Sequence, residues 1–106
     1  MFKGNLGDLI RQAQQIGENL KEKQAELAQR RVEVSVGGDM VRMTFNGRGE
    51  ALSIRIDKEA VDPNDVGMLE DLVLSAVNEG VRRSQQLMQE EMAKLTGGIN
   101  IPGITP

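Results

Sequence analysis

The sequence predicts an α+β protein with a long N-terminal helix, a three-stranded antiparallel meander and a long C-terminal helix, assembled as a homodimer. Both ends of the chain have apolar residues at helical spacing, the middle alternates apolar and polar residues, and turn residues separate the alternating runs. With 106 residues the chain has the length of one domain. We expect that domain to span residues 1–98, followed by a flexible tail over 99–106.

The first helix is predicted from about Leu6 to Arg30, a stretch that has no proline and many good helix formers. A heptad-like stripe with steps of four and three residues passes through Leu6, Ile10, Ala13, Gly17, Leu20, Gln24 and Leu27. This spacing is typical of an amphipathic helix.

Three short runs with a period of two predict the strands, at 31–36, 40–45 and 51–56. Glycine-rich loops at 37–40 and 46–49 separate them. Four-residue loops would pair Val34 with Met43 in the first hairpin and Val41 with Ile54 in the second. All apolar side chains then lie on one face of the sheet, which a helix must cover.

The second long helix is predicted to begin at Asp62-Pro63, because Asp62 can cap it and proline fits the first helical position. Asp65 favours the positive end of the helix dipole. Apolar residues then continue at helical spacing until Thr96-Gly97-Gly98 ends the helix.

Both helices are too long for a globule of this size. They would measure roughly 40 and 50 Å, whereas a compact domain of this length is only about 30–35 Å across. Their protruding apolar stripes therefore predict a homodimer. The apolar residues chosen for its interface are Val41, Met43, Phe45, Leu72, Val73 and Val77.

Gly17 and Gly80 each lie on an apolar stripe inside a helix, where glycine costs up to about 1 kcal/mol relative to alanine. Close approach of a neighbouring helix would offset this cost. A neutral substitution at a tolerant site is an equally good explanation.

The absence of His and Cys removes thiol nucleophiles, disulfides, the usual zinc ligands and any side chain that titrates near neutrality. The acidic group Asp57, Glu59, Asp62 and Asp65 does not match a calcium loop, and we interpret it as the acidic start of a helix. We therefore expect no enzyme, no metal and no cofactor.

The N-terminal residues lack the apolar core of a signal peptide, and no apolar run approaches the ~18 residues that span a bilayer. We expect a cytoplasmic protein that does not bind membranes.

The net charge is −3, but basic residues are concentrated near the first helix: residues 1–31 hold six basic and four acidic side chains. The candidate phosphate contacts are the cations on or near the two helices: Lys3, Arg11, Lys21, Lys23, Arg30, Arg31, Arg82, Arg83 and Lys94. With Phe2 and Phe45 as the only aromatic residues, stacking on single-stranded bases is disfavoured.

Several local motifs occur in an order and spacing that resembles the YbaB/EbfC family of bacterial nucleoid-associated proteins, over nearly the whole chain. The motifs are Met1-Phe2-Lys3-Gly4, Arg11-Gln12-Ala13-Gln14-Gln15, Asn46-Gly47, Ile54-Arg55-Ile56-Asp57, Met68-Leu69-Glu70-Asp71-Leu72-Val73, Ala76-Val77-Asn78, Glu91-Met92-Ala93-Lys94-Leu95-Thr96-Gly97-Gly98 and Pro102-Gly103.

This resemblance implies a tweezer-like homodimer, in which the sheets form the body and the long helices project as arms. It also implies that the protein binds double-stranded DNA in the nucleoid with little sequence preference. It further implies roles in nucleoid organisation and gene regulation, with Arg11 as the best candidate for a DNA contact. The alternative is a protein-interaction adaptor for a replication or recombination protein, which the overall acidity favours.

Overall fold

The computed structural model describes residues 5–95. Helix α1 (Leu6–Gln29) leads into strands β1 (Arg31–Val36), β2 (Val41–Asn46) and β3 (Ala51–Ile56). A short 3-10 helix, η1 (Lys58–Ala60), precedes helix α2 (Val66–Leu95). The strands form one antiparallel sheet in the order β1-β2-β3, which confirms the predicted helix–sheet–helix architecture. The expected tail, 99–106, lies outside the described residues.

Helix α1 begins where Asn5 caps it, since the Asn5 side chain accepts a hydrogen bond of 2.8 Å from the amide of Asp8. It ends at Gln29 because Arg30 already has extended backbone. Only Leu27 is buried along its length. Residues 9–22, which we call the α1 arm, are all exposed.

The first hairpin has the predicted register, with Val34 opposite Met43 and Val36 opposite Val41. Its loop turns through left-handed backbone at Gly37, Gly38 and Asp39, with φ of 63°, 62° and 70°. The glycine-rich turn that the sequence predicts therefore sets the pairing of β1 and β2.

The second hairpin differs from the expected register by two residues: Val41 pairs with Ile56 instead of Ile54. The cause is the Asn46 side chain, which accepts hydrogen bonds from the amides of Arg48 and Glu50 and so closes a shorter loop. A bulge on β3 between the Thr44 and Phe45 pairs adds the second residue of the shift. Because the shift is even, the apolar side chains keep their face.

Helix α2 begins later than predicted, at Val66 and not at Pro63. Residues 62–65 form a turn in which the Asp65 amide donates to the carbonyl of Asp62, 2.9 Å away. Pro63 occupies the second position of this turn, which its fixed φ also suits. The cap of α2 is Asp65, whose carboxylate accepts from the amide of Met68 at 3.3 Å.

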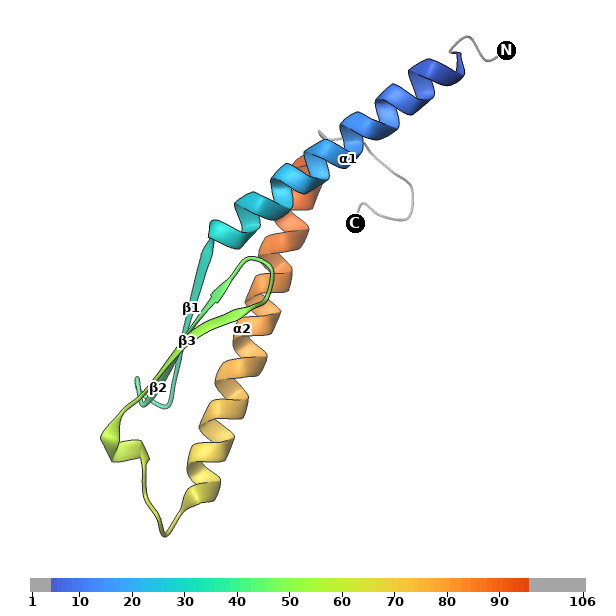
Figure 1. Cartoon of the computed structure of the whole chain (residues 1–106). Coiled ribbons are helices and arrows are strands. Elements are labelled where there is room, and N and C mark those ends of the chain that lie inside the picture. Colours follow the sequence, from blue (N-terminus) through green and yellow to red (C-terminus); the bar gives the residue numbers. More distant parts are fainter. Residues whose placement is uncertain (1–4, 96–106) are drawn as a thin grey trace.

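The core lies between α2 and one face of the sheet, and contains the buried residues Val34, Val41, Met43, Phe45 and Ala76. Helix α2 runs along β1 and β2 (Figure 1). Strand β3 remains uncovered: Ile54 lies opposite the buried Met43, yet 48% of its surface is exposed. A single helix thus covers only part of a three-stranded sheet.

The molecule is elongated, with extents of 72 × 26 × 17 Å and a radius of gyration of 20.3 Å. A compact domain of this length would have a radius of about 13 Å. Figure 1 shows that α1 crosses the last turns of α2 and continues well beyond them. The predicted protrusion of the N-terminal helix is therefore confirmed.

The two helical glycines have different environments. A Cβ built on Gly80 would lie 1.9 Å from the Phe45 ring, whereas a Cβ on Gly17 would meet nothing within 4 Å. Gly80 therefore allows α2 to approach strand β2 closely. The neighbour expected from the sequence was a helix. Gly17 has no such role within one chain.

We expect Gly80→Ala to lower the free energy of unfolding by about 1–3 kcal/mol, because the added methyl group must displace the Phe45 ring. The matched control Gly17→Ala should be neutral or stabilising by up to about 1 kcal/mol, because its methyl group meets open space. Urea unfolding followed by circular dichroism compares the two variants at one protein concentration. Equal midpoints would contradict the packing described.

Candidate nucleic-acid interface

Two of the nine predicted DNA-contacting cations lie on the α1 arm. Arg11 has a 78% exposed side chain and forms an ion pair of 3.4 Å with Asp8. Lys21 is exposed and has no hydrogen bond or ion pair to any residue among 5–95. Exposed ion pairs contribute at most about 1 kcal/mol. Both cations are therefore accessible to a phosphate group.

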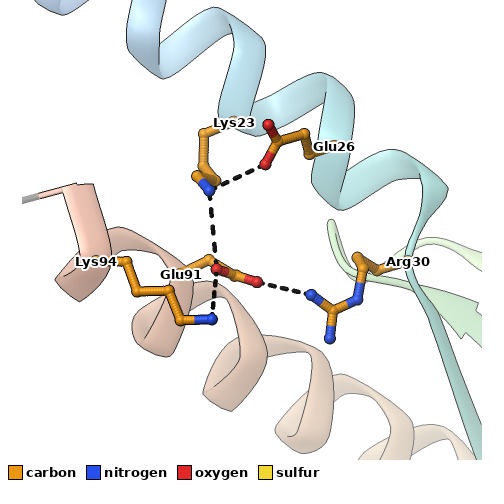
Figure 2. A network of polar contacts seen from close by, with 5 residues as sticks. All are labelled: Lys23, Glu26, Arg30, Glu91 and Lys94. Carbon is orange, nitrogen blue, oxygen red and sulfur yellow. Dashed lines mark hydrogen bonds and ion pairs between the residues drawn. The ribbon is translucent and has the colours of Figure 1, made fainter.

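Three other predicted cations meet at one carboxylate, where α1 crosses α2 (Figure 2). Glu91 on α2 is only 7% exposed. Its oxygens lie 2.6 Å from Arg30 Nη1, 3.3 Å from Lys94 Nζ and 3.8 Å from Lys23 Nζ. Lys23 also donates to Glu26 at 2.9 Å. We call these five residues the junction cluster. Lys23 and Arg30 connect α1 to Glu91, while Lys94 pairs with Glu91 within α2.

Charge pairing in the junction cluster shifts two pKa values. The Lys94 ammonium, by hydrogen bonding, is the main cause that lowers the pKa of Glu91, while burial of the carboxylate acts in the opposite direction. The charges of Lys94 and Lys23 and the Arg30 guanidinium lower it further. The hydrogen bond to Glu26 raises the pKa of Lys23. Glu91 is thus held as a carboxylate.

Arg82 and Arg83 share one partner on α2. Their guanidinium groups lie 2.7 and 2.8 Å from Glu79 Oε1, and these hydrogen bonds, that of Arg82 first, lower the pKa of Glu79. Arg83 also donates to the backbone carbonyl of Glu33 at 3.0 Å, which ties α2 to β1. Arg83 therefore has a structural contact in addition to any role with DNA.

Of the remaining two predicted cations, Arg31 follows the end of α1 and Lys3 lies outside the described residues. The Arg31 guanidinium donates to the carbonyls of Ala28 and Arg30, at 3.2 and 3.3 Å, and its side chain is exposed. The eight predicted cations among residues 5–95 do not form one continuous patch on a single chain.

The sequence reasoning missed the arginines of the sheet. Arg42 on β2 lies directly opposite Arg55 on β3, on the face that points away from α2. Both arginines alternate with apolar residues along their strands, and this alternation indicated that both are exposed. Their juxtaposition could not be predicted, because the expected register placed Arg42 opposite Ser53.

The residues expected at the dimer interface belong mostly to the core of one chain. Val41, Met43 and Phe45 are 0%, 7% and 1% exposed beneath α2. Leu72, Val73 and Val77 are partly buried against the same core. In this conformation α2 covers the first three residues, whereas Leu72, Val73 and Val77 remain partly exposed. Strand β3 exposes three further apolar residues, Leu52, Ile54 and Ile56.

Within residues 5–95 no three acidic side chains gather in the manner of a metal site. Neither of the long helices in that range has an apolar stretch that could cross a bilayer.

We expect Glu91→Gln to lower the urea midpoint at neutral pH, because it leaves three cations around a neutral side chain. The pKa of Glu91 is lower in the folded protein than in the unfolded chain, where it is about 4.5. The carboxylate therefore stabilises the fold above about pH 4.5, and this stabilisation is lost as the pH falls through the folded-state pKa. The difference between wild type and variant should therefore shrink below about pH 4.5.

Glu90→Gln is the matched control, because Glu90 is an exposed neighbour on the same helix without a hydrogen bond or ion pair to residues 5–95. Its midpoint should stay close to that of the wild type. Identical behaviour of both variants would show that the junction cluster does not hold the helices together.

Comparison with known proteins identifies the family. The chain matches the family model of the YbaB/EbfC DNA-binding family over residues 2–99. It is 51% identical over 100 residues to Nucleoid-associated protein Teth514_0034 of Thermoanaerobacter sp. (strain X514). These residues cover 94% of this chain and 90% of that protein. It is 48% identical over 103 residues to a nucleoid-associated protein of Moorella thermoacetica, and this match covers 97% of this chain and 99% of that protein.

The fold is similar to the crystal structure of an uncharacterized protein, HP0035, from Helicobacter pylori, with a TM-score of 0.77 and 19% identity. That similarity covers 91% of this chain and 100% of the other. It supports the fold, while the family match confirms the resemblance seen in the sequence. The chain belongs to the YbaB/EbfC DNA-binding family.

Proposed function

We propose that this protein binds duplex DNA as a homodimer, with little sequence preference, and alters the conformation of the DNA. The observation that carries the proposal is the α1 arm, which projects from the sheet with Arg11 and Lys21 exposed on it. Membership of a DNA-binding family supports duplex DNA as the ligand. In this proposal the protein acts in the bacterial nucleoid, organises it, affects gene regulation and catalyses no reaction.

The homodimer is supported by apolar surface that one chain leaves in water. On β3, Leu52 and Ile54 are each 48% exposed. On the α1 arm, Ile10 and Ile16 are 51% and 60% exposed. Full burial of a wholly exposed side chain of this kind is worth about 1.5–3 kcal/mol, so covering the exposed half of each contributes roughly half of that. A second copy supplies an identical apolar surface, and a twofold axis allows both to be buried together.

Low sequence preference follows from the kind of contact available. Arg11 and Lys21 can neutralise phosphates, which are the same in every sequence. Specific readout needs a helix or strand that presents several polar side chains to the base edges of a groove. The arm exposes amide side chains such as Gln12 and Gln15 as well, but apolar residues recur among them at regular intervals, which suits contact with another subunit.

We expect binding to any duplex to weaken steeply as salt rises. Each neutralised phosphate contributes about −0.9 to the slope of log K against log salt, so a dimer with four to eight contacts should give roughly −4 to −7. Fluorescence anisotropy of labelled duplexes of mixed sequence measures this slope. A flat titration, or no binding at low salt, would contradict the proposal and leave the adaptor as the better explanation.

The combined variant Arg11→Glu and Lys21→Glu should weaken duplex binding by about tenfold or more, because charge-assisted contacts contribute about 1.5–3 kcal/mol each. Lys58→Glu is the control: it makes the same kind of charge reversal on η1, at the far end of the sheet from the arm. Equal loss of affinity in both variants would indicate a general charge effect and not contact by the arm.

Ile54→Glu should shift the protein from dimer to monomer in sedimentation velocity, because a carboxylate would have to be buried in the interface. Ser53→Glu, one residue away on the opposite face of β3, should leave the dimer unchanged. A dimer that persists in Ile54→Glu would exclude this face of β3 from the interface.

A further inference from the structure

The sheet has a second face, which α2 does not cover. We call it the outer face and define it by residues that alternate with the core residues: Ser35, Arg42, Thr44, Ser53 and Arg55. Four of the five are exposed and Thr44 is half-buried. They line a broad concavity of about 860 Å³, so this face is hollowed, open and rich in hydrogen-bond donors.

Two arginines at the centre of the outer face lie directly opposite each other. Residues so paired on antiparallel strands have Cβ atoms only about 4.5–5.5 Å apart, and like charges there are destabilising. The Arg42–Arg55 pair is therefore unfavourable for the isolated fold. Anions bound at the two guanidinium groups would offset this repulsion.

The protein itself neutralises only one of the two charges. Arg42 lies 3.4 Å from Asp39, but both side chains are more than half exposed, so this ion pair is weak. Asp39 also accepts a short hydrogen bond from the Ser35 hydroxyl, which is the main cause that lowers its pKa. Arg55 has no hydrogen bond or ion pair among residues 5–95.

The charge balance of this concavity differs from that of the whole chain. It is lined by three arginines and two carboxylates, the carboxylates being Glu33 and Asp39, whereas the chain as a whole carries −3. One of the arginines, Arg83, comes from α2 and reaches the edge of β1. The outer face is thus a local positive site on an acidic protein.

We propose that the outer face is a second contact surface for the sugar–phosphate backbone of duplex DNA. Arg42 and Arg55 each bind one phosphate, for which the planar guanidinium offers paired donors. The hydroxyls of Thr44 and Ser53, the next opposite pair on the same face, lie beside the arginines and donate to phosphate oxygens. This inference rests on the proposed DNA-binding function and adds a site that is separate from the α1 arm.

Charge complementarity and the shape of the site favour this occupant. The concavity is wide and open and has no aromatic side chain among its lining residues, so it offers nothing for a stacked base or a single nucleotide to rest on. The face also stays free in the proposed dimer, because Ile54 and the other apolar residues of β3 point to the opposite side. DNA on the outer face and a subunit on the inner face are therefore compatible.

The test is the salt dependence of duplex binding by the variant Arg42→Gln with Arg55→Gln. If each arginine neutralises one phosphate in each protomer, the dimer loses four contacts and the slope becomes shallower by about 3–4. The control, Arg48→Gln with Lys58→Gln, removes the same charge from two exposed cations outside the concavity. Its slope should change by less than about 1.

A second variant tests the site without removing an arginine. Ser53→Glu places a carboxylate beside the two guanidinium groups and should make the slope shallower, while the protein remains a folded dimer by sedimentation and circular dichroism. A wild-type slope in both outer-face variants would overturn the inference and leave the proposed function intact. Failure of the wild-type protein to bind any duplex would overturn both.

Discussion

The close approach of α2 to the sheet, where Gly80 faces the Phe45 ring, determines how the rest of the surface is divided. The helix lies low over β1 and β2 and buries Val34, Val41 and Met43 beneath it. One helix cannot also cover β3, so an apolar edge remains for a partner. The polar face on the far side stays open. Core packing in one chain thus leaves one surface suited to assembly and another suited to a charged ligand.

The junction cluster determines where the α1 arm points. The α1 helix has little apolar contact with the rest of the chain, and Leu27 is its only buried residue. The Glu91 carboxylate therefore supplies most of the polar connection between the last turns of the two helices. Removing one partner of a shielded ion pair leaves the other charges unpaired, which is why such a cluster can hold an orientation. The arm is held near its base, where Ile16 and Leu20 border the same hollow as Met92 and Leu95 of α2, and residues 9–22 all remain exposed.

Local patterns in the sequence were sufficient for the elements but not for every contact between them. The valine alternation and the Gly37-Gly38 turn gave the register of the first hairpin, because both constraints are local. The second register depended on side-chain hydrogen bonds of Asn46, which no periodicity reveals. The Arg42–Arg55 pair was missed for the same reason. Likewise, exposure of Lys23 and Arg30 could not be judged until Glu91, 61 residues beyond Arg30, was known to meet them.

The central claim is that two chains together hold one duplex through contacts to its backbone. Sedimentation equilibrium of the protein mixed with a short labelled duplex at low salt tests it most directly. The account predicts a complex of two protomers with one duplex, which dissociates into dimer and free DNA as salt is raised. A complex of one protomer per duplex, or a complex whose stability does not depend on salt, would contradict it.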